Sequence, residues 1–297
     1  MRRYAIEQVT NLLARLAFEV RRTLRSHDAP SIHDLRVTGR RLEQALELFA
    51  PFFPQKERKK VRKRLRQMMD AAGKVRNYDV VMDLAGGLGL ASSDPVTRKL
   101  RETRDGLARE LATLLKKFTR RDFSSRWRNR LGLIDVEPPR PKAAQMTVAK
   151  SARYTLPLAA AEFFQAGRKA FESDRSSNKA LHEFRLVAKS FRYSLELFAP
   201  IYGPALRKRL ESLQQLQRLL GEVHDCVVAR SLLLEDGVHK RNGLADRLEI
   251  LEQARRENFR RYWNNRMDSP GEQQLWVAYL SQFAGRRRNR ILAAAAR

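Results

Sequence analysis

One twenty-residue phrase occurs twice in this 297-residue chain, and it constrains the fold more than any other feature. Residues 32–51 read IHDLRVTGRRLEQALELFAP, and residues 181–200 read LHEFRLVAKSFRYSLELFAP. Eight of the twenty positions are identical, and the two copies align without a gap. The period is much longer than that of the short solenoid repeats, so the duplication predicts two similar halves.

Helical spacing of apolar residues dominates the chain, and the alternation typical of strands is scarce. Proline and glycine clusters set the expected ends of the helices. We predict helices over residues 4–25, 31–50, 56–73, 74–81, 96–119, 146–172, 177–199, 204–221, 223–240, 243–264 and 272–296. A proline-rich stretch predicts a linker near residues 131–145. The expected fold is all-α, with one antiparallel helical bundle in residues 1–140 and a second in residues 141–297.

A second, shorter echo follows each phrase: GKVRNYDVV at residues 73–81 and GEVHDCVVA at residues 221–229. Asn77 and Asp225 are expected to be turn or N-cap residues between two helices. Arg76 and His224 fit either a cap or a binding site, and we favour the cap.

On a helical wheel each long phrase has an apolar side and a basic side. The apolar side predicts buried core. Its members are Leu35, Leu42, Leu46 and Phe49 in the first copy, and Phe184, Phe191, Leu195 and Phe198 in the second. The opposite side carries His33, Arg36 and Arg40, matched by His182, Arg185 and Lys189 with Arg192 beside them. Such a line of like charges repels itself and is unfavourable unless an anion neutralises it.

The helix after each phrase adds further cations on one flank, namely Arg62 and Arg66 in the first half and Arg207 and Arg218 in the second. Glu47 and Glu196 stand at the far end of the two basic lines. They are interpreted as braces that orient an arginine, and simple salt bridges are an equal alternative.

The charge of the whole chain points to an anionic partner. Lys and Arg number 60 against 33 Asp and Glu, which gives a net charge of +27. His33 to Arg40 covers roughly 10 Å of helix axis, which is too long for one phosphate and suits several anionic groups in a row. If the two basic sides faced a common channel, its field would concentrate a linear polyanion.

Other classes of protein fit the sequence less well. One cysteine, Cys226, excludes an internal disulfide and indicates a reducing compartment, and no apolar run is long enough for a membrane span, so we expect a cytoplasmic protein. Because glycine-loop, paired-acid and zinc-type motifs are absent from the sequence, we expect no enzyme, metal or cofactor. Nonspecific RNA or DNA binding is the alternative function. Trp127 and Trp263 could stack on bases, although packing at helix ends is the favoured role.

The phrases HDLRVTGRRL and HEFRLVAKSFRYSLELF, with GKVRNYDVV after the first, resemble the CHAD domain, the conserved histidine α-helical domain. The resemblance covers roughly residues 4–290. It implies two four-helix-type bundles related by a pseudo-twofold axis around a basic central cavity. It also implies binding of inorganic polyphosphate, in some members at polyphosphate granules.

Matching positions imply a set of polyphosphate contacts. They are His33, Arg36, Arg40, Arg41, His182, Arg185, Lys189 and Arg192. Glu43, Ser190 and Asn77 depart from the family pattern, which implies unequal contributions from the two halves.

Overall fold

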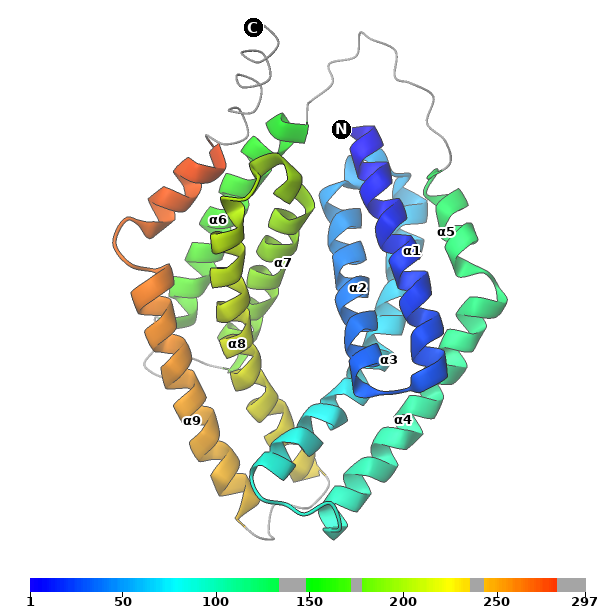
Figure 1. The fold of residues 1–297 in the computed structure, drawn as a ribbon, viewed down its shortest axis with the longest axis vertical. Coiled ribbons are helices and arrows are strands. Elements are labelled where there is room, and N and C mark those ends of the chain that lie inside the picture. Colours follow the sequence, from blue (N-terminus) through cyan, green and yellow to red (C-terminus); the bar gives the residue numbers. More distant parts are fainter. Residues whose placement is uncertain (134–147, 172–177, 236–242, 282–297) are drawn as a thin grey trace, which may run out of the picture. The chain divides into compact units, whose positions relative to one another are not determined.

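The computed structural model describes residues 1–133, 148–171, 178–235 and 243–281. All regular elements in these ranges are helices, so the predicted all-α class is confirmed (Figure 1). They are α1 (Arg2–Ser26), α2 (Ala29–Leu48), η1 (Ala50–Phe52), α3 (Gln55–Gly87), α4 (Pro95–Arg120), α5 (Phe123–Arg130), α6 (Val148–Phe171), α7 (Asn178–Tyr202), α8 (Leu206–Glu235), α9 (Leu244–Tyr262) and η3 (Trp263–Met267). Residues 272–281 are also helical. In the described part, no helix combines the length and apolar character that a membrane span requires.

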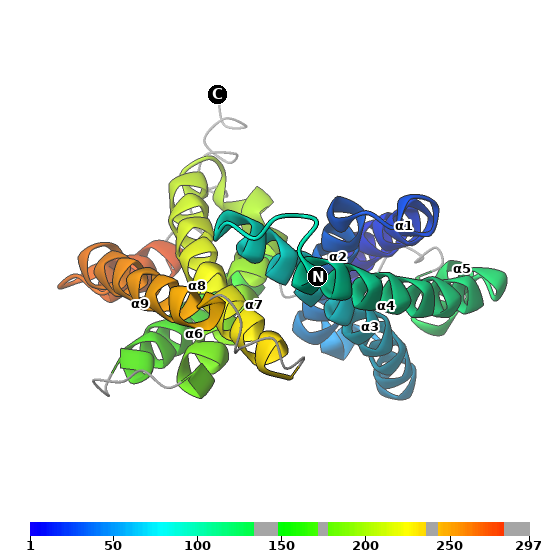
Figure 2. The same ribbon diagram turned by 90° about the horizontal axis from the view of Figure 1, so that it is seen from below.

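The first half is held together by apolar faces of its long helices. In Figures 1 and 2, α1 lies beside α2 and α3 lies beside α4, and both pairs pack together. The predicted apolar side of α2 is fully buried at Leu35, Leu42 and Leu46, as is Phe49, which caps the helix, and α1 packs beside it with a buried stripe that includes Val9, Leu13 and Leu16. This burial confirms the predicted core of the first copy and leaves the opposite side of α2 available for polar side chains.

Aromatic side chains fill the core of the second half. Phe163 of α6 stacks on Phe191 of α7 with ring centroids 5.2 Å apart, and Trp263 contacts Phe163 and Phe184 edge to face. All four side chains are at most 1% exposed. Trp263 therefore has the predicted packing role, and so has Trp127 in the first half, which is 3% exposed.

Two predicted helix breaks are wrong. α3 continues from Gln55 to Gly87 through Gly73 and Asn77, and α8 continues from Leu206 to Glu235 through Gly221 and Asp225. A single glycine lowers helix propensity by about 1 kcal/mol, which packing of a long apolar face readily outweighs. Asn77 and Asp225 are therefore interior helix residues rather than caps, and the positions three residues after each glycine lie on the same face as that glycine.

Contacts divide the chain into two compact units. The first-half unit contains Arg2–Pro139 together with Asp225–Leu251, and the second-half unit contains Arg140–His224 and Glu252–Arg297. The predicted bundles are residues 1–140 and residues 141–297, so the prediction assigns the segment 225–251 to the second bundle, whereas the contacts group it with the first half. The physical reason for its placement is a shared apolar cluster of Val81, Leu100, Ala229, Leu233, Leu244 and Leu248. The predicted linker from 134 onward lies outside the described residues.

Candidate anion-binding site

The first basic face, defined as His33, Arg36 and Arg40 of α2 with Arg76 of α3, is built on the exposed side of α2. Asp28 caps this helix, because its Oδ1 accepts a hydrogen bond of 2.8 Å from the backbone N–H of Ser31. The buried side fixes the rotation of α2, so His33, Arg36 and Arg40 point away from the core.

Arg36 crosses from α2 to α3. Its Nη1 donates a hydrogen bond of 2.9 Å to the backbone carbonyl oxygen of Met69. A Cβ placed on Gly73 would lie 2.5 Å from the same Nη1, which is closer than any real contact allows. Gly73 therefore leaves the space in which the guanidinium of Arg36 lies against α3.

The second half repeats this contact. A Cβ placed on Gly221 of α8 would lie 3.2 Å from Nη1 of Arg185, which α7 carries. His182 of α7 lies beside His224 of α8, with ring centroids 5.5 Å apart. We define the second basic face as His182, Arg185 and Lys189 of α7 with His224 of α8. The repeated phrase and the shorter echo thus form one contact in each unit: an arginine from the first helix lies across a glycine of the next.

The charges of the first basic face affect the pKa of His33. Partial desolvation lowers its pKa from the ordinary value of 6.5, and the positive charge of Arg76 lowers this pKa further. Asp34 acts in the opposite direction, and Arg36 and Arg40 add smaller lowering effects. Arg76 therefore acts on His33 in the same direction as Arg36 and Arg40, which is why we include Arg76 in the first basic face.

Part of the predicted basic set is already paired with the chain's own acids. Arg62 contacts Glu47, and its Nη2 is 3.5 Å from Glu43, while Arg66 Nε is 2.7 Å from Glu43. Glu47 also contacts Arg58 at 3.4 Å. These contacts favour the salt-bridge interpretation of Glu47, and an outside anion would have to compete with Glu43 and Glu47 for Arg62 and Arg66.

The second half shows the same division. Arg192 Nη1 is 3.7 Å from Glu196, and Arg218 Nη1 is 2.6 Å from Glu222. Arg207 is exposed, but it lies fourteen residues before Gly221, which is roughly 21 Å along α8. The structure therefore separates Arg207 from the contact made by Arg185.

The remaining predicted cations lie on α2 and α7. Arg40, Arg41 and Lys189 are all partly buried. Arg40 has no acidic partner among the described residues. Lys189 stands one turn after Arg185, the position that Arg40 holds relative to Arg36. Most of the predicted basic residues of α2 and α7 therefore belong to the two basic faces.

Four residues with a role in the two faces were missed or assigned elsewhere by sequence reasoning, namely Gly73, Arg76, Gly221 and His224. Their signal was present in the shorter echo, because each glycine occurs at nearly the same distance after the arginine of its phrase. A glycine inside a helical pattern marks either a break or a close approach, and here it marks a close approach. Within the described residues, no group of three or more His, Cys, Asp and Glu has an arrangement that could hold a metal ion.

Comparisons with known proteins identify the family and the fold. Residues 7–234 match the family model of the CHAD domain. The crystal structure of the CHAD domain from the plant Ricinus communis superposes with a TM-score of 0.63 at 20% identity, over 95% of this chain and 92% of that chain. PptA from Streptomyces chartreusis gives a TM-score of 0.58 at 19% identity, over 87% of this chain and 98% of that chain. Comparison with curated proteins gave no significant match. Because the family model covers more than half of the sequence, the chain belongs to the CHAD domain family.

Proposed function

We propose that this chain binds inorganic polyphosphate through its two basic faces and does not process it. One observation carries the proposal: Arg36 lies over Gly73 and Arg185 lies over Gly221, each three residues after an exposed histidine. An arginine that lies against a helix has already lost part of its side-chain freedom, so less entropy is lost when it binds an anion.

The length of each face favours a chain of linked phosphates over a single one. The three cationic positions of α2 span roughly 10 Å, and α7 repeats them. Arginine binds pairs of phosphate oxygens through its planar group, and a protonated histidine can donate from both ring nitrogens. A common channel between the two faces, as the family resemblance implies, remains part of the proposal. The same partner would bring the protein to polyphosphate granules.

The carboxylates around the first face support binding without catalysis. Asp34 follows His33 directly, but its Oδ2 accepts a hydrogen bond of 2.6 Å from Arg22. Glu43 and Glu47 are engaged by Arg62, Arg66 and Arg58. Carboxylates that are held by arginines are poor candidates for a general base or for a pair of metal ligands. Incubation with polyphosphate and Mg²⁺ or Mn²⁺ should therefore release no phosphate. Steady release that His33→Ala abolishes would contradict this part of the proposal.

Nucleic acid is the alternative partner, since phosphate contacts alone can bind RNA or DNA. Burial of Trp127 and Trp263 argues against it, because neither ring offers a face on which a base could stack. Labelled polyphosphate competed against single-stranded RNA at equal charge and about 0.15 M salt separates the two partners. Polyphosphate should win, and displacement by RNA at equal charge would favour the alternative.

The direct test removes the two seated arginines. Arg36→Ala combined with Arg185→Ala should weaken polyphosphate binding by at least about tenfold, because each lost contact is a charge-assisted hydrogen bond. Helicity and melting temperature should change little, since both side chains lie outside the core. The matched control is Arg101→Ala with Arg153→Ala, which removes the same charge from exposed positions of α4 and α6. Equal losses in both double variants would show that net charge alone drives binding, and unfolding of the first variant would make the arginines structural.

A further inference from the structure

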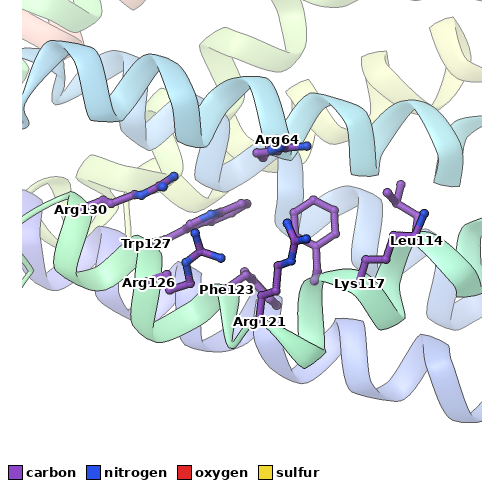
Figure 3. A pocket seen from close by; sticks show the side chains of 9 residues that line it. Arg64, Leu114, Lys117, Arg121, Phe123, Arg126, Trp127 and Arg130 are labelled. Carbon is purple, nitrogen blue, oxygen red and sulfur yellow. The ribbon is translucent and has the colours of Figure 1, made fainter.

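A cavity on the first-half unit lies outside both basic faces. It has a volume of about 180 Å³ and lies between α3, the end of α4 and α5 (Figure 3). Its apolar lining comes from Leu114, Phe118, Phe123 and Trp127, and its cations are Arg64, Lys117, Arg121, Arg126 and Arg130. We call this site the α5 cavity. None of its lining residues belongs to either basic face.

A second hollow of about 350 Å³ adjoins the α5 cavity. It is lined by Lys60, Lys63, Arg64, Gln67 and Arg130, so it shares Arg64 and Arg130 with the first. Seven cations therefore line the two hollows together. α3 thus carries two different rows of positive charge: Arg62 and Arg66 contact the acids of α2, whereas Arg64 and its neighbours line these hollows.

Acidic side chains compensate little of this charge. Glu57 Oε1 is 2.6 Å from Lys60, and Glu57 Oε2 is 3.5 Å from Arg130. The hydrogen bond from Lys60 is the main cause that lowers the pKa of Glu57, so this group is a carboxylate at neutral pH. Lys117, Arg121 and Arg126 are exposed and have no ion-pair partner among the residues that the structure describes. Their mutual repulsion is unfavourable in the ligand-free protein and would be relieved by an anion.

The floor of the cavity is fixed before any ligand arrives. Phe123 and Trp127 are 5% and 3% exposed, and their ring centroids are 5.1 Å apart in an edge-to-face contact. Asp122 fixes the turn between α4 and α5, because its left-handed backbone starts α5 and its Oδ1 accepts a hydrogen bond of 3.3 Å from the Ser125 N–H. This turn places Arg121 and Arg126 on either side of the floor, across from Arg64 (Figure 3).

We propose that the α5 cavity and its adjoining hollow form a second anion-binding site, which takes a short run of linked phosphate groups. Seven cations spread over two hollows exceed the charge of a single phosphate, whereas a triphosphate could contact both hollows at once. The apolar floor gives the cavity one wall of low polarity, and charges beside such a wall attract an anion more strongly than charges surrounded by water. Such a run is found in inorganic oligophosphates and in nucleoside triphosphates alike.

The experiment uses the three tryptophans of the full chain as separate reporters. The protein is labelled with 5-fluorotryptophan, and Trp127→Phe assigns the fluorine resonance of Trp127. Inorganic tripolyphosphate should shift this resonance, while Trp263 and Trp276, which are buried in the second-half unit, should respond little. A nucleoside triphosphate titrated in the same way distinguishes the two sources: equal affinity assigns recognition to the phosphates alone, and tighter binding adds a contact from the base.

Adjacent positions at the C-terminal end of α4, where Arg121 is the C-cap residue, provide a matched pair of variants. Lys117→Ala with Arg121→Ala removes two cations of the cavity and should weaken the tripolyphosphate affinity reported by Trp127 by about tenfold or more. Lys116→Ala with Arg120→Ala removes the same residue types at the same spacing, one position earlier, from exposed sites that do not line the cavity. That control should change the affinity by less than about threefold.

Three results would overturn the proposal. Equal losses of tripolyphosphate affinity in the two double variants would mean that binding depends on net charge alone. Equal binding of an oligoglutamate of the same charge would exclude recognition of phosphate. Loss of the Trp127 response in the Arg36→Ala, Arg185→Ala double variant would show that no separate site exists. If instead the response survives in that variant, the second site stands whether or not the basic faces bind polyphosphate.

Discussion

Gly73 and Gly221 each lie under the guanidinium of an arginine from the preceding helix. Gly73→Ala puts a methyl group 2.5 Å from the present position of Arg36 Nη1. The end of a long side chain moves easily, so we expect the fold to tolerate the change, and alanine improves helix propensity by about 1 kcal/mol. The displaced arginine, however, loses its bond to Met69 and its fixed position. We therefore predict unchanged or higher stability with weaker polyphosphate binding.

The control for this prediction lies in the same helix. A methyl group added at Gly86 of α3 would meet no atom within 4 Å, so Gly86→Ala makes no collision. Titration with polyphosphate and thermal unfolding of both variants separate binding from stability. If Gly73→Ala binds as tightly as Gly86→Ala, the glycine does not position Arg36.

A second prediction at this scale concerns protons. Desolvation and the charge of Arg76 lower the pKa of His33 below 6.5 in the ligand-free protein, so His33 is neutral at pH 7. Bound phosphate would raise this pKa, and the complex would then hold up to one more proton than the free protein. Polyphosphate affinity should therefore increase as pH falls from about 7.5 to 6, by at most about tenfold per pH unit for one proton.

His33→Gln should flatten this pH profile while the ligand's own titration stays the same in both proteins. Calorimetry in buffers of different ionisation enthalpy measures the proton uptake directly. Identical uptake by the wild type and the variant would mean that His33 does not face the bound anion.

At the scale of elements, the apolar sides of α2 and α7 can be predicted from the sequence, because apolar residues repeat at helical spacing. The structure buries them, with Leu35 and Phe184 both at most 1% exposed. The full lengths of α3 and α8 cannot be predicted, since a glycine inside a helix and a glycine after a helix look the same in one sequence. The segment 225–251 belongs to the first half because of contacts between residues that are far apart along the chain, and the spacing of apolar residues in the sequence does not show such contacts. The ion pairs of Arg62 and Arg66 depend on the relative rotation of two helices.

One buried ion pair joins α4 to α3 and gives the third prediction. Arg104 Nε donates a hydrogen bond of 3.0 Å to Asp79 Oδ1, and Arg104 Nη2 donates one of 2.7 Å to the carbonyl oxygen of His27. Asp79 is 5% exposed. Arg104→Ala leaves this carboxylate buried without its cation and should lower the free energy of unfolding by about 3 kcal/mol.

Urea unfolding measures this loss. Arg101→Ala, at an exposed position one turn earlier in α4, should change the unfolding free energy by less than about 0.5 kcal/mol. Adding Asp79→Asn to Arg104→Ala should recover part of the loss, because the amide carries no charge. Equal urea midpoints for the two single arginine variants would show that the pair contributes nothing.

At the scale of the whole molecule, the first half does not complete its own core. The cluster around Val81 of α3 and Leu100 of α4 also contains Leu233 of α8 and Leu244 and Leu248 of α9. Each of these three leucines is at most 3% exposed and contributes about 1.5 to 3 kcal/mol by burial, so their sum approaches the net stability of a typical domain.

A fragment of residues 1–139 should therefore lose protection against amide hydrogen exchange around Val81 and Leu100 and should bind a hydrophobic dye. The helices α1 and α2, which pack on each other, should keep more of their protection. Coexpression with residues 140–297 restores the missing leucines and should restore slow exchange around Val81 and Leu100. If the isolated fragment exchanges as slowly as the full chain around Val81, the segment 225–251 is not required for this core, and the first half folds as an independent bundle.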